Sequence, residues 1–211
     1  MRKHKCSAQP EKINHLKTME EDWKKLAEGY DEMDWSFSSA FAWEKIVKEN
    51  PKPFYLIQYV DQLRLSGNYS EAEQIISKIK IEEIPGKYQF VYHIRKGMLH
   101  EDQGEIEKAI ESYRKSTQLK TDDTYPYIFL AAALSKRSKL DEAEEVFLEA
   151  LKKEGDIDEV NYNLSFVYAR KQDFKKAIAA IKECINLDPN YPNAKTWLAD
   201  FENMENKMKN K

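Results

Sequence analysis

Aromatic and histidine side chains are the residues of this chain whose types and spacing could do chemistry. Three of its four tryptophans, Trp23, Trp35 and Trp43, fall between residues 20 and 46. Converging ring faces could hold a cation by cation–π attraction. His93 and His100 are seven residues apart and therefore share one face of a helix. A metal-binding pair on a helix usually takes a spacing of four, so packing is the expected role of both histidines.

Signatures of catalysis and of metal binding are absent from the sequence. It has no glycine-rich phosphate loop, no nucleophile motif and no zinc-ligand cluster. Carboxylates are abundant, but they are mixed with lysines as on solvated helix faces. We therefore expect no catalytic residue, no metal and no cofactor, and a protein that is not an enzyme.

The composition excludes several broad classes of protein. Of the 211 residues, 34% are charged and 12% are aromatic, which is too aromatic for a disordered chain. Only 6 glycines and 7 prolines argue against an all-β fold, which needs many turns. The formal net charge of -3 gives no general attraction to nucleic acid or to an anionic membrane. No apolar stretch is long enough to span a membrane.

The cysteines and the N-terminus bear on localisation. Cys6 lies in the N-terminal tail and Cys184 in a helical pattern, a poor disulfide framework that favours a reducing compartment. The basic start MRKHK is not followed by an apolar run, so it does not fit a secretory signal. We therefore expect a cytoplasmic protein.

An internal repeat supplies the elements that would position any binding surface. Ala109, Ala143 and Ala177 are separated by 34 residues each. An apolar residue precedes each alanine by three positions and a large one follows it by four, which places all three on one helix face. These flanking residues are Ile106 and Tyr113, Leu140 and Phe147, and Phe174 and Ile181. The segments before the alanines repeat too, so one period holds two amphipathic helices of about 14 residues each.

This 34-residue unit, with small residues at its eighth and twentieth positions, resembles the tetratricopeptide repeat family. Residues 158–191 match the family pattern at Leu164, Ser165, Tyr168, Ala177, Ile181 and Pro189. Residues 124–157 match it at Tyr127, Leu130, Ala131, Ala143, Phe147 and Ala150. Residues 90–123 fit less closely, because Lys96 and His100 replace apolar residues. The resemblance implies an all-α fold, an α-α superhelix in which helix pairs stack as a right-handed solenoid.

The repeat register divides the chain. We expect an N-terminal tail and helix extension over residues 1–19, about five units over 20–191, and a C-terminal capping helix with a basic tail over 192–211. The units run over 20–52, 53–89, 90–123, 124–157 and 158–191, and the first is divergent. In this register Trp23 and Trp43 take core positions, whereas Trp35 falls at a turn. We therefore expect Trp23 and Trp43 to pack between helices rather than to form a cage.

The resemblance also implies a binding surface. In the family, certain positions on the first helix of each unit line an inner groove, and here these positions carry Ile94, Met98, Tyr125, Ile128, Ala132, Tyr162 and Phe166. An apolar stripe on an exposed face favours a protein-binding groove. Its expected basic rim, Arg95, Lys136 and Arg170, would steer an acidic or amphipathic segment. The alternatives are that the array curls enough to bury the stripe, or that the chain's own tail fills it.

The expected function is non-catalytic binding of a helical or extended peptide segment of another protein, in an adaptor, scaffold or chaperone-like role. A self-associating structural scaffold is one alternative, and a regulatory or co-chaperone protein is another. The latter would lack the family's carboxylate clamp, because Glu28 and Asp61 stand where the clamp needs an amide. RNA binding through the short basic tails MRKHK and KMKNK is not expected. We expect neither nucleic acid nor membrane among the partners.

Overall fold

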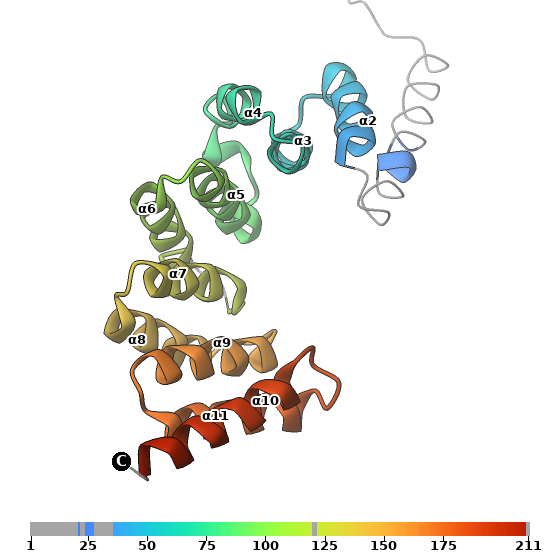
Figure 1. Cartoon of the computed structure of the whole chain (residues 1–211). Coiled ribbons are helices and arrows are strands. Elements are labelled where there is room, and N and C mark those ends of the chain that lie inside the picture. Colours follow the sequence, from blue (N-terminus) through green and yellow to red (C-terminus); the bar gives the residue numbers. More distant parts are fainter. Residues whose placement is uncertain (1–20, 22–23, 28–35, 120–121, 210–211) are drawn as a thin grey trace, which may run out of the picture. The chain divides into compact units, whose positions relative to one another are not determined.

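The structure is a computed structural model that describes residues 21, 24–27, 36–119 and 122–209 (Figure 1). The described residues form helices and turns, with one isolated β-bridge between Asp123 and Glu154. The all-α fold expected from the sequence is therefore confirmed. The chain divides into two compact units, Met1–Gly86 and Lys87–Lys211.

The first unit contains α2 (Ser36–Glu49), α3 (Pro53–Leu65), α4 (Tyr69–Ile76) and the 3-10 helix η1 (Ile81–Glu83). Trp43 is 3% exposed, and the centre of its ring lies 6.0 Å from that of Tyr55, which confirms the core role expected for this tryptophan. Ser39 is fully buried and occupies the small-residue position of α2. Trp23 and Trp35 lie outside the described residues, so their expected roles stay predictions.

The second unit is a stack of helix pairs. A short 3-10 helix, η2 (Gly86–Tyr88), precedes the first pair. The pairs are α5 (Gln89–Asp102) with α6 (Ile106–Thr117), α7 (Tyr125–Lys136) with α8 (Leu140–Ala150), and α9 (Ile157–Arg170) with α10 (Phe174–Leu187), followed by α11 (Ala194–Lys209). Each pair packs on the next, because α6 contacts α7, α8 contacts α9 and α10 contacts α11. The predicted alternation of two helices per period is confirmed in this unit.

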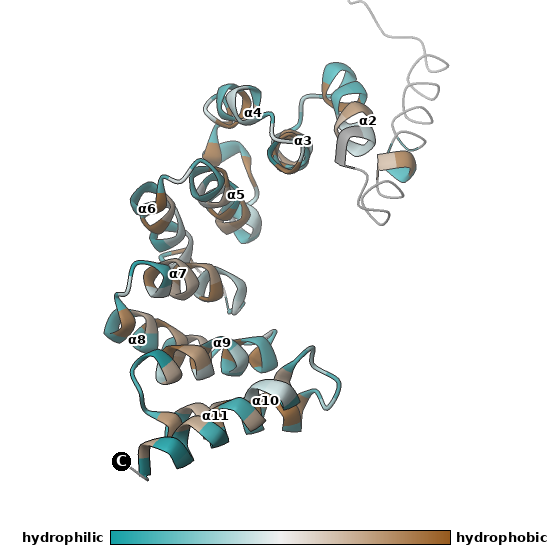
Figure 2. Ribbon diagram, in the orientation of Figure 1, coloured by the Kyte–Doolittle hydropathy of each residue, from teal (hydrophilic) through white to brown (hydrophobic). Residues whose placement is uncertain are grey.

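Small residues allow the two helices of each pair to approach closely. Ala109, Ala143 and Ala177 have no exposed surface. At Gly97 the approach is so close that an added Cβ would lie 2.3 Å from the ring of the fully buried Tyr113. Figure 2 shows hydrophobic residues along α7, whereas the turns that join α7 to α8 and α9 to α10 are hydrophilic. The core therefore lies between the helices and the turns face water.

The turn inside each pair repeats its backbone conformation. Gly104, Ser138 and Gln172 have φ values of 77°, 60° and 62°, and they stand 34 residues apart. This left-handed conformation is open to glycine but strained for a residue with a Cβ atom. The later two turns therefore hold strain that the first one avoids.

Replacing Gln172 by glycine is expected to raise the free energy of unfolding by about 0.5–1 kcal/mol. Relief of the strained φ outweighs the extra freedom that glycine gives the unfolded chain. Urea unfolding followed by circular dichroism would measure the change. The exposed Glu145, inside α8, serves as control, since Glu145→Gly should cost about 1 kcal/mol. Equal losses at both positions would show that the turn is not strained.

Candidate partner-binding surface

Two of the predicted groove residues belong to the core. Ile94 and Ile128 are 0% and 5% exposed and lie in the hydrophobic core of the second unit. They pack inward because neighbouring first helices contact each other directly, α5 with α7 and α7 with α9. Neither isoleucine therefore presents a surface to a partner, which corrects their expected place in a groove.

Other predicted residues on α5 and α7 keep part of their surface in solvent. Met98, Tyr125 and Ala132 are partly exposed. The ring of Tyr125 stands edge-on to that of Phe129, with centres 4.8 Å apart, and Phe129 lies 5.5 Å from the buried Tyr113. Phe129 is also partly exposed, although the sequence pattern did not select it. It lies in the run YIFLAAAL, which is apolar on every side of the helix, so periodicity could not single it out.

On α9 the predicted strip meets the chain's own C-terminal helix. The centre of the Phe166 ring lies 5.0 Å from Trp197 and 5.7 Å from Phe201, both on α11. The Tyr162 ring lies 4.7 Å from that of Tyr191, in the turn before α11. Tyr162 and Phe166 are therefore partly covered by the C-terminal segment. We define the inner strip as the four partly exposed residues Met98, Tyr125, Phe129 and Ala132.

The cations of the predicted rim are engaged within the array. Lys136 forms an ion pair with Glu101 of the preceding pair. Arg170 donates to the backbone oxygen of Ser135, to Ser135 Oγ at 2.8 Å and to Ser138 Oγ at 3.1 Å. Arg95 donates to the Sδ atom of Met98 at 3.2 Å. Lys136 and Arg170 thus tie one helix pair to the next.

Ion pairs repeat along the same end of the helices. Arg137 lies 2.8 Å from Glu107. The equivalent residues of the following repeat, Lys171 and Asp141, lie 2.6 Å apart. Hydrogen bonds to Asp141 and Glu144 raise the pKa of Lys171, and the bond from Lys171 lowers the pKa of Glu144. Positive charge at this end is therefore balanced by carboxylates of the protein itself.

The opposite ends of α7 and α9 carry acidic side chains around a hollow of about 460 Å³. The hollow is lined by Asp122, Asp123, Tyr125, Glu154, Gly155 and Asp156. The loops that carry these residues run side by side, since Thr124 N donates to the backbone oxygen of Glu154 at 2.9 Å and Asp156 N donates to Thr124 Oγ1 at 3.0 Å. Gly155 permits this close approach, because a Cβ there would lie 2.8 Å from Thr124 Oγ1. The pairing of the two loops holds acidic side chains beside Tyr125.

Four of the acids at this end form no ion pair in the part of the chain that the structure describes. Asp122, Glu154, Asp156 and Asp158 form no ion pair with another described residue, whereas Lys152 and Lys153 nearby pair with Glu149. Burial raises the pKa of Glu159 in the first turn of α9, and the charges of Asp156 and Asp158 raise it further. Uncompensated negative charge therefore gathers at this end.

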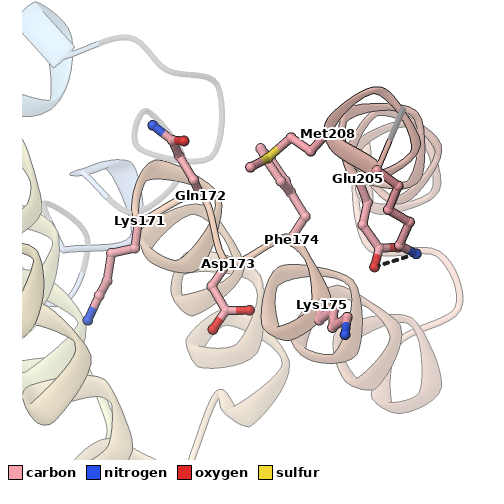
Figure 3. Close-up of a pocket in the computed structure, with 8 residues that line it drawn as sticks. Lys171, Gln172, Asp173, Phe174, Lys175, Glu205 and Met208 are labelled. Carbon is pink, nitrogen blue, oxygen red and sulfur yellow. Dashed lines mark ion pairs between the residues drawn. The ribbon is translucent and has the colours of Figure 1, made fainter. Parts of the chain in front are cut away.

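A second hollow, of about 410 Å³, lies between the start of α10 and the end of α11. Figure 3 shows Met208 reaching from α11 toward Phe174, while Lys171 and Asp173 point away from these two side chains. Two of the lysines around this hollow are paired: Lys171 binds Asp141, and Lys209 lies 2.8 Å from Glu205. The hollow therefore offers a small apolar floor among side chains that are mostly charged.

The two histidines of α5 take packing roles, as expected. The ring of His93 lies 5.2 Å from that of Tyr92, and burial lowers the pKa of His93 to about 4, helped by Lys115 and Lys96. His100 is 7% exposed, and its Nδ1 atom lies 3.0 Å from the Glu105 carboxylate. Among the described residues, no group of three or more His, Cys, Asp or Glu side chains is suited to hold a metal ion.

Comparison with known protein families identifies the family of these helical repeats. Residues 158–191 and residues 91–123 each match the family described as Tetratricopeptide repeat. This chain is a tetratricopeptide repeat protein. A comparison with curated proteins gave no match.

Solved structures agree with the fold of this tetratricopeptide repeat protein. A thermophilic protein of the family from Thermus thermophilus, TTC0263, is 15% identical with a TM-score of 0.69, over 86% of this chain and 98% of that one. MamA from Desulfovibrio magneticus RS-1 is 17% identical with a TM-score of 0.62, over 82% and 97%. YrrB, described as having an unusual peptide-binding site, is 15% identical with a TM-score of 0.59, over 90% and 98%. At these identities the likeness shows the fold alone.

Tetratricopeptide repeats are a general protein-interaction module, and the family is typically non-catalytic. None of the described helices of this tetratricopeptide repeat protein combines the length and the apolar character that a membrane span requires.

Proposed function

We propose that this tetratricopeptide repeat protein is a non-catalytic binding module whose inner strip receives a helical or extended segment of another protein. The observation that carries the proposal is the Tyr125 and Phe129 ring pair, which rests on the buried Tyr113 and keeps part of its surface in water. Aromatic side chains that are already held in place lose little conformational freedom when a partner covers them. Such a surface suits an adaptor, scaffold or chaperone-like role.

Two further observations support this proposal. YrrB, of similar fold, is described as a tetratricopeptide repeat protein with a peptide-binding site. In the first unit, the Asp61 carboxylate is buried and accepts a bond from Arg64 at 3.0 Å, which suits a module without the carboxylate clamp. We also place its working compartment in the cytoplasm, because Cys184 is a buried free thiol.

The substitution Ala132→Gln tests the proposal. It puts a bulky, neutral, polar side chain on the inner strip without removing a core contact, and glutamine is a good helix former. Because covering the amide costs about 1–3 kcal/mol, partner capture from the native cell should fall about tenfold. Ala179→Gln makes the same change on the exposed side of α10 and should leave capture unchanged.

Equal capture by the wild-type protein and by Ala132→Gln would rule out binding at the inner strip. Tyr162 and Phe166 are poorer probes, because their loss would also loosen α11. Light scattering over a range of concentrations separates the alternative: a self-associating scaffold would form oligomers that Ala132→Gln dissociates.

A further inference from the structure

The two ends of the inner strip differ in whether their charged side chains form ion pairs within the protein. At the end where α7 turns into α8, Lys136 is paired with Glu101, and Arg137 is paired with Glu107. An acidic partner would have to compete with these carboxylates for the same cations. This end is therefore a poor place to recognise negative charge.

The other end holds negative charge next to an aromatic ring of the strip. Tyr125 belongs to the inner strip and also lines the hollow of about 460 Å³ with Glu154 and Asp156. The hydrogen bonds between the two loops keep these groups together. A cation in this hollow would meet carboxylates and the neighbouring tyrosine ring, both of which attract positive charge.

Helix dipoles account for only part of this acidity. Asp158 and Glu159 stand in the first turn of α9, where a negative charge is favoured by the helix itself. Asp122 and Glu154, however, precede the helices α7 and α9 and lie outside their first turns. Neither carboxylate forms an ion pair with another residue that the structure describes, and the helix dipoles do not account for the charge of either.

From this asymmetry we infer that the segment bound by the inner strip is a basic amphipathic peptide, with a lysine or arginine lying over the hollow beside Tyr125. Its apolar side chains cover Phe129 and Ala132, and its cation contacts Glu154 and Asp156. The inference rests on the proposed function and adds that the bound segment of the partner is positively charged. It keeps the amphipathic character of the acidic or amphipathic segment expected from Arg95, Lys136 and Arg170, but it replaces an acidic charge by a basic one.

The test uses two labelled amphipathic helical peptides of equal length, one made of leucine and lysine and the other of leucine and glutamate. Fluorescence anisotropy with the full chain measures their binding at low and at high salt. The leucine–lysine peptide should bind more tightly, and salt should weaken it because the contacts are exposed. Glu154→Gln with Asp156→Asn should weaken its binding about fivefold to tenfold and reduce its salt dependence.

The matched control is Glu145→Gln with Glu183→Gln, which removes the same charge from exposed sites on α8 and α10. It should bind the leucine–lysine peptide as the wild-type protein does. Thermal unfolding of both double variants, followed by circular dichroism, checks that each is folded.

Three results would overturn the inference. The first is equal or tighter binding of the leucine–glutamate peptide, and the second is no binding of either peptide. The third is an equal effect of the two double variants, which would leave the acids of the hollow only a structural role. If Ala132→Gln still reduces partner capture in any of these cases, the proposed function stands and only the charge of its partner is wrong. If Ala132→Gln has no effect either, both fail.

Discussion

Phe147→Ala is expected to lower the free energy of unfolding by about 3–5 kcal/mol, because it empties a closely packed site. Phe147 is 1% exposed, and it stands in α8 where the neighbouring repeats place the fully buried Tyr113 and Ile181. The α7–α8 pair is packed on both sides, since α6 contacts α7 and α8 contacts α9. The cavity therefore opens in the middle of the second unit, where the surrounding helices are least able to close it.

Urea unfolding by circular dichroism would measure this loss, with Leu148→Ala as the control. Leu148 is the next residue of α8 and is 43% exposed, so its loss should change the stability by no more than about 0.5 kcal/mol. Because repeat arrays are coupled only through neighbours, the Phe147 variant should also unfold over a broader range of urea. Similar losses for the two variants would mean that α8 is not packed as described.

Phe201→Ala is expected to release α11 locally. Phe201 is 2% exposed, and its ring lies 5.7 Å from Phe166 of α9 and 6.0 Å from Trp197. Its removal should cost about 3–5 kcal/mol of the docking free energy of α11. Since α11 packs against α10 at one end of the stack, the earlier pairs should keep their structure.

Amide hydrogen exchange can separate this local release from global unfolding. Amides of α11 should exchange much faster in the Phe201 variant, while those of α7 and α8 keep their protection. Met204→Ala is the control, because Met204 lies on the same helix but is 42% exposed. Faster exchange throughout the second unit would contradict the neighbour-only coupling that we assign to the stack.

The repeat architecture could be predicted from the sequence because packing imposes it on particular residues. Only a small side chain fits where two helices of a pair meet, and Ala109, Ala143 and Ala177 mark that place at a fixed period. The left-handed turn was less visible, because Gly104 gives way to Ser138 and Gln172 in the later repeats. In each repeat it falls two positions after the last residue of the first helix, whichever residue type stands there.

The surface was harder to predict, because exposure depends on neighbours that a single helix does not reveal. Ile94 and Ile128 fit the groove positions of the family, yet adjacent first helices bury them. The sequence could not show that the rim cations are paired. Lys136 and its partner Glu101, for example, are 35 residues apart in the chain. The acidic hollow arises from two loops that meet only in three dimensions, at Thr124 and Glu154.

The fixed place of the left-handed turn has a consequence for building longer arrays. Counting one more period from Gln172 leads to Asn206, and from Phe174 to Met208, yet α11 runs as a continuous helix through both. Asparagine is among the side chains that accept a left-handed turn most readily. α11 thus takes the place of the first helix of a further pair, and Asn206 stands where the turn to a second helix would fall. A designed helix fused directly after Met208 would find the turn residue in place, which makes this position a ready splice site for modular extension.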